Sequence, residues 1–260
     1  MTRPPQGLLL DLDGVFYVGD TLVEGALETV RFLAEQDIPH RYVTNTTTRN
    51  LAQLVEKLHR LGLPIGDDEI LSAPLAARDY LLAQGIRRVR LVVRESLLPD
   101  FAALTRDETH PEAVVIGDIG NAWNYDLLDS LFRNLVDGAR LVALHRNRYW
   151  QTAEGLRLDI GAFVAALEYA ARTEAVVMGK PSCDFFRTAL EALGLPAAEV
   201  AMIGDDIESD VGGAQACGLH GVLVHTGKYR PELAARAGVT PDRELASIAE
   251  LPRLFGPAAH

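Results

Sequence analysis

The stretch LLLDLDGVFY, residues 8–17, combines an apolar run with two acidic residues and a glycine. The run Leu8–Leu10 shows no polar alternation, which is typical of a strand buried on both faces. Asp11 and Asp13 follow two residues apart, so in an extended chain their side chains project from the same side. In an open α/β sheet, ligands bind beyond the carboxyl ends of the strands, where both acids fall. The motif alone also fits an ordinary turn in which an aspartate precedes Gly14.

Similar apolar runs recur along the chain and are separated by amphipathic segments. They predict the other strands of one parallel sheet, at Tyr42–Val43, Ala175–Met178, Val200–Ile203 and Val222–Val224. The segments Leu51–Leu61 and Phe185–Leu193 each carry their apolar residues on one helical face. This alternation of strands and helices predicts an α/β fold with a doubly wound parallel sheet.

The gap between the second and third motif-bearing runs is too long for a simple crossover. It spans about 130 residues, so we expect an inserted α/β domain at residues 73–173, flanked by the two parts of the core, 1–72 and 174–260. The insert has its own strand and helix patterns. The strands are expected at Val89–Val93, Ala113–Ile116 and Leu141–Leu144, and the helices at Leu75–Ala83, Tyr125–Val136 and Ala162–Ala171.

A second acidic strand end lies in MIGDDIESD, residues 202–210. Asp205 and Asp206 end one apolar run, and Asp210 follows about one helical turn later. Carboxylates brought together from two strand ends repel each other unless a cation is present, and oxygen-only ligands favour Mg²⁺ over zinc or copper. Acids at a helix N-terminus also interact favourably with the helix dipole, which is the alternative explanation for part of this cluster.

Two further segments supply groups suited to phosphate. In HRYVTNTTTRN, residues 40–50, the hydroxyl of Thr44 and the turn at Asn45 can hold phosphate oxygens, although an ordinary helix N-cap is the alternative. In AVVMGKPS, residues 175–182, Lys180 follows a strand pattern and can offset negative charge, although a solvated surface lysine is the alternative.

Taken in order, DLDGV, VTN, GKP and GDDIESD resemble the four motifs of the haloacid dehalogenase (HAD) superfamily. The insert resembles the C2-type cap of the NagD-like and p-nitrophenylphosphatase-like branch, subclass IIA. Further segments, among them MIGDDIESDVGGAQACG and TGKYR, are similar to the phospholysine phosphohistidine inorganic pyrophosphate phosphatase group. This second resemblance covers nearly the whole chain.

The resemblance implies a HAD-like Rossmannoid core and a Mg²⁺-dependent phosphatase acting on small phosphomonoesters or phosphoanhydrides through an aspartyl-phosphate intermediate. It implies that Asp11 is the nucleophile and a metal ligand. Asp13 would be the general acid and base and would also bind the metal through its main-chain carbonyl. Asp205 would be the other protein ligand.

The resemblance assigns the remaining motif residues to phosphate binding and to support of the site. Thr44 and Asn45 would bind the transferring phosphoryl group, and Lys180 would neutralise charge beside the nucleophile. Asp206 or Asp210 would orient water or the lysine, and the sequence leaves the choice between them open.

The overall composition excludes several classes of partner. A formal net charge of −11 argues against nucleic-acid or anionic-membrane binding, so we expect a small phosphorylated substrate. Cys183 and Cys217 are far apart and have no metal-ligand spacing, which predicts two reduced, packed thiols. The start MTRPPQG lacks the apolar core of a signal peptide, and no long apolar run occurs, so we expect a cytoplasmic location.

Two other functions are compatible with part of this pattern. A receiver-type signalling module also accepts phosphate on an aspartate of a doubly wound sheet, but it lacks a large insert and needs no second acid such as Asp13. A non-catalytic HAD homologue is the other alternative.

The segment His145–Trp150 is the expected specificity loop of the insert. It gathers arginines, an asparagine and aromatics, a mixture that suits an anionic or planar leaving group, and its central candidates are Asn147, Arg148 and Tyr149. The same composition is enriched at protein interfaces, so a homodimer through the cap is an equal alternative.

Overall fold

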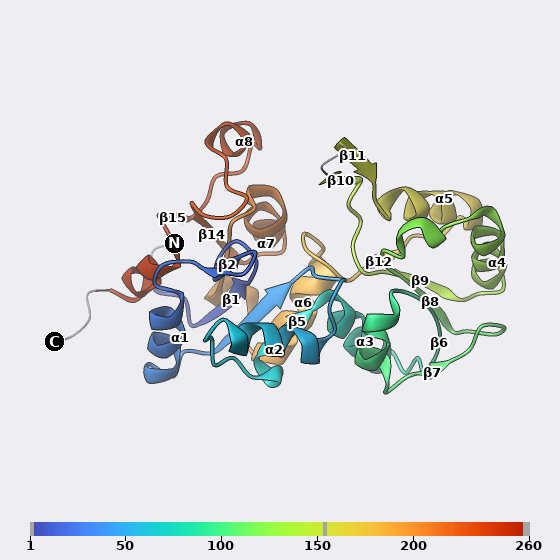
Figure 1. Ribbon diagram of the computed structural model, residues 1–260, viewed down its shortest axis with the longest axis horizontal. Coiled ribbons are helices and arrows are strands. Elements are labelled where there is room, and N and C mark those ends of the chain that lie inside the picture. The colour runs from blue at the N-terminus through green and yellow to red at the C-terminus, as the bar shows by residue number, and fades with distance from the viewer. Residues whose placement is uncertain (1–2, 153–154, 257–260) are drawn as a thin grey trace. The chain divides into compact units, whose positions relative to one another are not determined.

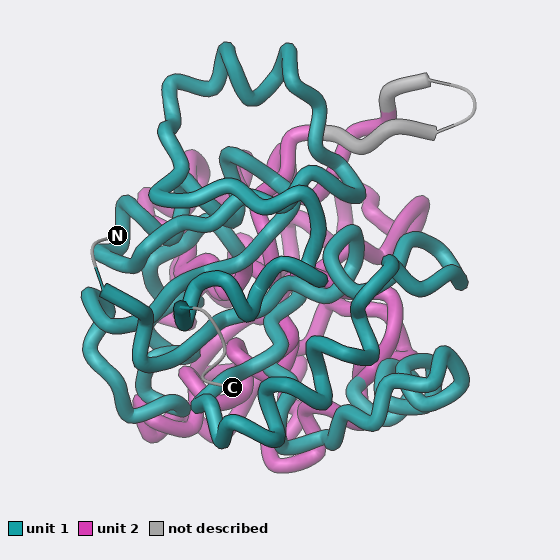
Figure 2. The backbone as a smooth tube through the Cα atoms, turned by 90° about the vertical axis from the view of Figure 1, so that its left-hand side faces the viewer, with its two compact units in different colours: residues 1–44, 51–71, 180–260 teal, residues 45–50, 72–179 magenta. Residues whose placement is uncertain are grey.

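The computed structural model describes residues 3–152 and 155–256, and only the backbone of residues 149–152 and of residues 155 and 156. The chain divides into two compact units (Figure 2). Unit 1 comprises residues 1–44, 51–71 and 180–260, and unit 2 comprises residues 45–50 and 72–179. The long insert of unit 2 runs from residue 72 to residue 179, where residues 73–173 were expected, and residues 45–50 group with it.

Within the described residues, unit 1 is built on a six-stranded sheet of order β15-β14-β13-β1-β4-β5 (Figure 1). The central pairs β13–β1 and β1–β4 and the outer pairs β13–β14 and β14–β15 are parallel. The strands are β1 (Gly7–Asp11), β4 (His40–Thr44), β5 (Ile70–Ser72), β13 (Val200–Gly204), β14 (His220–Val224) and β15 (Arg243–Leu245).

Helices cover both faces of this sheet because its strands are apolar on both sides. Leu8 and Leu10 of β1 join a core cluster with one set of helices, while Leu9, equally buried, points to the opposite face. The first set is α1 (Ala26–Glu35), α2 (Leu51–Arg60) and the 3-10 segment η6 (Ile248–Phe255). The other elements are α6 (Cys183–Leu193), the π-helical turn η5 (Ile207–Gly212), α7 (Gly213–Ala216), α8 (Pro231–Arg236), the short 3-10 turns η1 (Asp67–Glu69) and η4 (Ala197–Glu199), and the hairpin β2 (Tyr17–Val18)–β3 (Thr21–Leu22).

The expected doubly wound α/β architecture is thereby confirmed. Burying one leucine side chain contributes roughly 1.5–3 kcal/mol, so the fully buried Leu8, Leu9 and Leu10 of the central strand contribute substantially to the stability of unit 1.

Unit 2 has a separate parallel sheet of order β12-β9-β8-β6-β7 among the residues that are described. Its strands are β6 (Arg88–Val92), β7 (Thr105–Arg106), β8 (Ala113–Ile116), β9 (Arg140–Ala143) and β12 (Val176–Val177). The other elements are α3 (Ala73–Ala83), η2 (Glu95–Phe101), η3 (Gly120–Ala122), α4 (Tyr125–Val136), α5 (Gly161–Ala171) and the hairpin β10 (Tyr149–Thr152)–β11 (Gly155–Leu158). The inserted α/β unit and its predicted strands and helices are all present.

One strand assignment from the sequence is wrong. The run Ala175–Met178 was expected in the first sheet, but Val176 and Val177 pair with β9 of the second sheet. An apolar run specifies that a strand is buried, and it does not specify which strand lies beside it.

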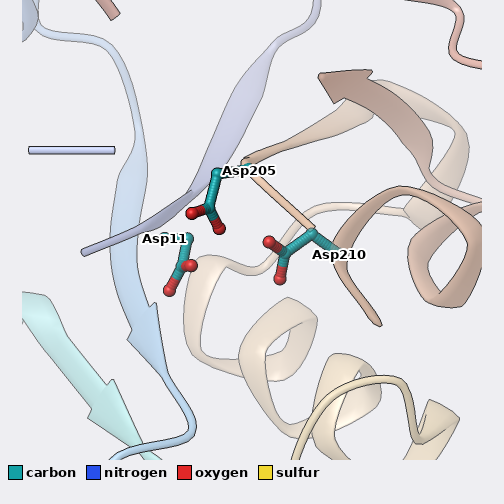
Figure 3. Close-up of side chains that lie close together, drawn as sticks. All are labelled: Asp11, Asp205 and Asp210. Carbon is teal, nitrogen blue, oxygen red and sulfur yellow. The ribbon is translucent and has the colours of Figure 1, made fainter. Parts of the chain in front are cut away.

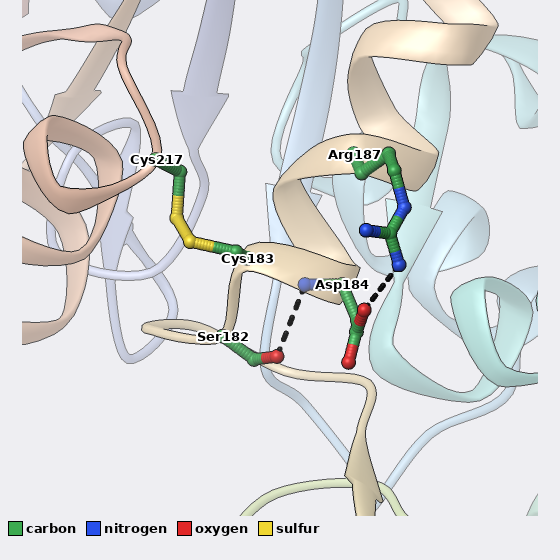
Figure 4. Close-up of a disulfide and its surroundings, with 5 residues drawn as sticks. All are labelled: Ser182, Cys183, Asp184, Arg187 and Cys217. Atoms are coloured by element: carbon green, nitrogen blue, oxygen red, sulfur yellow. Dashed lines mark hydrogen bonds and ion pairs between the residues drawn. A yellow bond between two sulfur atoms is a disulfide. The ribbon is translucent and has the colours of Figure 1, made fainter.

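The interpretation of the two cysteines as reduced thiols is also wrong. Cys183, the first residue of α6, and Cys217, just after α7, form a disulfide with their Cα atoms 5.4 Å apart (Figure 4). Because α6 and α7 contact each other, the two residues meet although 34 positions separate them in sequence. The spacing along the chain gave no sign of this contact.

Among the residues that the structure describes, every helix is too short or too polar to span a bilayer.

Reduction of the Cys183–Cys217 bond is expected to destabilise the protein by about 3–4 kcal/mol, since opening a loop of this length gives the unfolded chain more freedom. Urea unfolding with and without dithiothreitol measures the effect. The double variant Cys183→Ala/Cys217→Ala should not respond to the reductant. Equal unfolding midpoints for the oxidised and reduced wild type would contradict a stabilising role.

Candidate active site

Two acidic side chains of unit 1 end neighbouring strands of its sheet. Asp11 is the last residue of β1, and Asp205 directly follows β13, which pairs in parallel with β1. Parallel neighbours end at the same edge of a sheet, so the two carboxylates converge there. Asp210, in η5, points toward the same place (Figure 3). One carboxylate oxygen of each of the three residues lies within 4.8 Å of the other two.

Lys180 binds two of these acids directly. Its Nζ lies 2.8 Å from Oδ1 of Asp11 and 2.7 Å from Oδ1 of Asp210. The main-chain N–H of Leu12 also donates to Asp11 Oδ1, at 2.9 Å. All four charged side chains are almost fully buried, with exposed fractions of 5% for Asp11, 4% for Lys180, 1% for Asp205 and 0% for Asp210.

Burial and mutual repulsion raise the pKa values of the acids. Burial is the main cause for Asp205, whose pKa rises to about 6, with a further contribution from the charge of Asp210. Burial likewise raises the pKa of Asp210 to about 6, and it also raises the pKa of Asp11. In both cases the charge of Lys180 acts in the opposite direction. Burial lowers the pKa of Lys180, but the two bound carboxylates, Asp11 and Asp210, raise it by more. The net effect is a raised pKa, so the ammonium stays charged.

The donor set fits a hard divalent cation. Oδ1 of Asp205 is buried and has no hydrogen-bond partner among residues 3–152 and 155–256, and an unpartnered buried carboxylate oxygen is costly. The candidate ligands are all carboxylate oxygens, which Mg²⁺ prefers. Lys180 pairs with two of the three carboxylates, so the acids outnumber the lysine that binds them.

The two candidate supporting acids have different contacts. Asp206 caps η5 by accepting hydrogen bonds from the main-chain N–H groups of Glu208 and Ser209, at 3.1 and 3.0 Å. Although burial opposes the change, these bonds lower the pKa of Asp206. Asp210 instead binds Lys180 and accepts from the N–H of Asp206 at 3.1 Å. Asp210 is therefore the acid placed to orient the lysine.

The remaining core candidates lie in different surroundings. Asp13 is exposed in a turn in which Gly14 N donates to Tyr17 O. Thr44 is buried at the end of β4, one residue beyond Val43, which lies opposite Asp11 in the register. Asn45 begins the segment that belongs to unit 2.

The loop candidates also belong to unit 2. Asn147 and Arg148 are exposed. The main-chain carbonyl of Asn147 accepts a hydrogen bond from the N–H of Gly161, and that of Arg148 accepts one from the N–H of Asp159. Tyr149 begins β10, but its side chain lies outside the described residues.

Sequence reasoning missed a third group of residues at the carboxyl edge. Thr226–Lys228 follow β14, which lies next to β13. Lys228 N donates to Asp205 Oδ2 at 2.6 Å, and Thr226 Oγ1 donates to Gly14 O at 2.6 Å. Its position in the sequence could have indicated it, because this segment follows the apolar run of a predicted strand, as Asp11 and Asp205 do.

The fold and this cluster define an open α/β unit with a lysine-bridged acidic centre at the carboxyl edge of its sheet, where the oxygen donors fit a divalent cation. Residues 8–104 match the family described as Haloacid dehalogenase-like hydrolase, and residues 177–251 match a HAD-hydrolase-like family. The chain belongs to the haloacid dehalogenase-like hydrolases.

Relatives and solved structures agree over most of the chain. Haloacid dehalogenase-like hydrolase domain-containing protein 2 of Bos taurus is 43% identical, over 88% of this chain and 87% of that protein. The human phospholysine phosphohistidine inorganic pyrophosphate phosphatase is 38% identical, over 94% and 92%. The structure of p-nitrophenyl phosphatase from Archaeoglobus fulgidus superimposes with a TM-score of 0.86 at 31% identity, over 96% of this chain and 99% of that one. Assignment to the NagD-like and p-nitrophenylphosphatase-like branch is confirmed, and the receiver-type alternative is not supported.

Without metal, ionisation of Asp205 is expected to destabilise the folded chain. Its folded pKa of about 6 lies above the ordinary 3.8, so the folded state holds the proton more tightly than the unfolded state. This contribution to stability is complete below about pH 4 and is lost as the pH rises through 6.

The loss amounts to at most about 3 kcal/mol, at about 1.4 kcal/mol per pKa unit. Urea unfolding in chelator from pH 4 to pH 7.5, compared with Asp205→Asn, isolates the effect, because the variant has no carboxyl group to ionise there. We expect the variant to gain stability relative to wild type as the pH rises. A pH-independent difference between the two proteins would show that the explanation is wrong.

Proposed function

We propose that this chain is a Mg²⁺-dependent phosphatase that hydrolyses small phosphomonoesters or phosphoanhydrides through an aspartyl-phosphate intermediate. The observation that carries the proposal is the buried cluster in which Lys180 bridges Asp11 and Asp210 while Asp205 keeps an unpartnered oxygen. The names of the relatives support the reaction class, since one is a pyrophosphate phosphatase and another a p-nitrophenyl phosphatase.

The residues that would hold Mg²⁺ are Asp11 and Asp205, through their side chains, and Asp13, through its main-chain carbonyl. When bound, the ion would offset the negative charge of these acids and of the phosphoryl group. Asp210, already paired with Lys180, supports the cluster from the side of η5.

Asp11 is the proposed nucleophile. Lys180 and the Leu12 N–H both bind its Oδ1, so we expect Oδ2 to be directed to phosphorus. The Asp11 O–P bond forms as the bond from phosphorus to the leaving oxygen breaks. Lys180 stabilises the charge near the nucleophile, and Thr44 and Asn45 are proposed to bind the phosphoryl oxygens.

Asp13 is the proposed general acid and base. Its exposed carboxyl group can reach a substrate and a water molecule. In the first step it gives a proton to the leaving oxygen. In the second it removes a proton from water, whose oxygen then bonds to phosphorus and releases inorganic phosphate and free Asp11.

Asp11→Asn should lower kcat for p-nitrophenyl phosphate by at least about 10³-fold, because an amide is a poor nucleophile of nearly the same volume. Phosphate release under multiple turnover with added Mg²⁺ measures this. Asp37→Asn is the matched control, since Asp37 is exposed and its left-handed backbone suits asparagine. Near-normal turnover of the Asp11 variant would show that Asp11 is not the nucleophile.

The same assay in chelator tests the metal. Activity should disappear and return with Mg²⁺. Full activity in chelator would contradict the metal requirement, whereas an inactive wild type over a broad substrate panel would favour the alternative of a non-catalytic HAD homologue.

We also propose that Asn147, Arg148 and Tyr149 help to select the substrate. Arg146 is engaged in an ion pair with Glu168 at 2.6 Å, while Arg148 is an exposed residue. The guanidinium group of an arginine can bind an anionic leaving group through charge-assisted hydrogen bonds. The competing proposal, a homodimer through the cap, uses the same residues as an interface.

Arg148→Ala distinguishes these proposals. A release screen over sugar phosphates, nucleotides, pyridoxal phosphate, phosphoamino acids and pyrophosphate first identifies the best substrate. If Arg148 grips the leaving group, kcat/KM for that substrate should fall about tenfold and that for p-nitrophenyl phosphate should stay within about twofold. Arg133→Ala, an exposed arginine of α4, is the control. An equal change for all substrates together with a changed mass in light scattering would support the interface instead.

A further inference from the structure

The segment Thr226–Lys228 ties two parts of the candidate site together. The main-chain N–H of Lys228 donates to Asp205 Oδ2 at 2.6 Å, and the Thr226 hydroxyl donates to the carbonyl of Gly14 at 2.6 Å. Gly14 directly follows Asp13 in the turn after β1. One short segment after β14 therefore contacts both the acid that ends β13 and the turn that carries the second acid of the DLDGV motif.

Gly227 allows this close approach. A Cβ atom at Gly227 would overlap Asp205 Oδ2 and the Cα atom of Gly14, and the residue has a positive φ of 55°. Gly14 is equally restricted, because a Cβ there would overlap the same carboxylate and its φ is 94°. Both glycines are required by space as well as by backbone conformation. The carboxylate of Asp205 thus lies against two glycines, Gly14 and Gly227.

The contacts divide the two oxygens of Asp205 between two roles. Oδ2 is bound by the Lys228 N–H, whereas Oδ1 is buried and has no hydrogen-bond partner in the described part of the chain. A hydrogen bond to one carboxylate oxygen fixes the rotation of the group and so determines where the other oxygen points.

We propose that Thr226–Lys228 is a positioning clamp that presents Asp205 Oδ1 to the metal and holds the Asp13–Gly14 turn beside it. The inference rests on the proposed function, because it takes Asp205 as a metal ligand. The Lys228 side chain is mostly exposed and lies 3.9 Å from Asp206. The clamp acts instead through the main chain of Lys228, the absence of a side chain at residue 227 and the hydroxyl of Thr226.

The decisive comparison is Gly227→Ala against Gly238→Ala. Both glycines have a positive φ, 55° and 68°, so both variants strain the backbone in the same way. A Cβ at Gly238 meets nothing within 4 Å, whereas one at Gly227 displaces Asp205. Titration calorimetry with Mg²⁺ on the full-length protein should show a Kd at least about tenfold higher for Gly227→Ala. Gly238→Ala should bind within about twofold of wild type.

A second pair of variants serves if Gly227→Ala does not fold by circular dichroism. Thr226→Val removes the hydroxyl that binds Gly14 at nearly constant volume, and Thr226→Ser retains it. We expect the valine variant to raise the Kd for Mg²⁺ severalfold and to lower kcat for p-nitrophenyl phosphate, and the serine variant to restore both values.

The outcomes separate this inference from the proposed function. If wild type binds Mg²⁺ and a folded Gly227→Ala variant binds it equally well, the clamp is wrong and the proposed function stands. The clamp is also overturned if Thr226→Val binds like wild type, or if Gly238→Ala weakens binding as much as Gly227→Ala does. A wild-type chain that does not bind Mg²⁺ would overturn the proposed metal site and the clamp with it.

Discussion

Buried carboxylates of like charge can share one site only where positive charge lies among them. Asp11, Asp205 and Asp210 meet at one edge of the sheet, and each unpaired buried charge would cost several kcal/mol. Lys180 compensates part of this charge by binding two of the acids at once. The proposed Mg²⁺ would offset the remaining charge and would let the site accept a phosphate group. The surrounding structure holds these groups in place against their repulsion.

The sheet order determines which residues can take part. Because β1 lies between β13 and β4, the acids of two distant motifs become neighbours, and Thr44 ends the strand on the other side. Close packing completes the arrangement, since a Cβ at Gly204 would overlap Asp210, as one at Gly14 would overlap Asp205. The parallel sheet holds the acids in fixed positions, and the glycines leave space for their carboxylates.

Much of this was predictable from the chain, because its strands are apolar runs that end in acids. The doubly wound fold and the inserted α/β unit followed from local patterns, whereas the roles expected of the motif residues came from the resemblance to the HAD superfamily. Features that depend on a partner far along the chain followed from neither. The sheet to which Val176 belongs depends on which strand lies beside it. The disulfide depends on two helices meeting, and the bond from Lys228 to Asp205 uses a main-chain N–H, which every residue except proline has.

The bond between Cys183 and Cys217 closes a covalent ring in the polypeptide. The ring contains β13 and the acids Asp205 and Asp210, and Lys180 lies just outside it. A single proteolytic cut anywhere within the ring would therefore leave both fragments joined, with the acids still tethered beside the start of α6. Survival of the site after backbone cleavage would then depend on the redox state of the surroundings, since only a reductant could release the fragments.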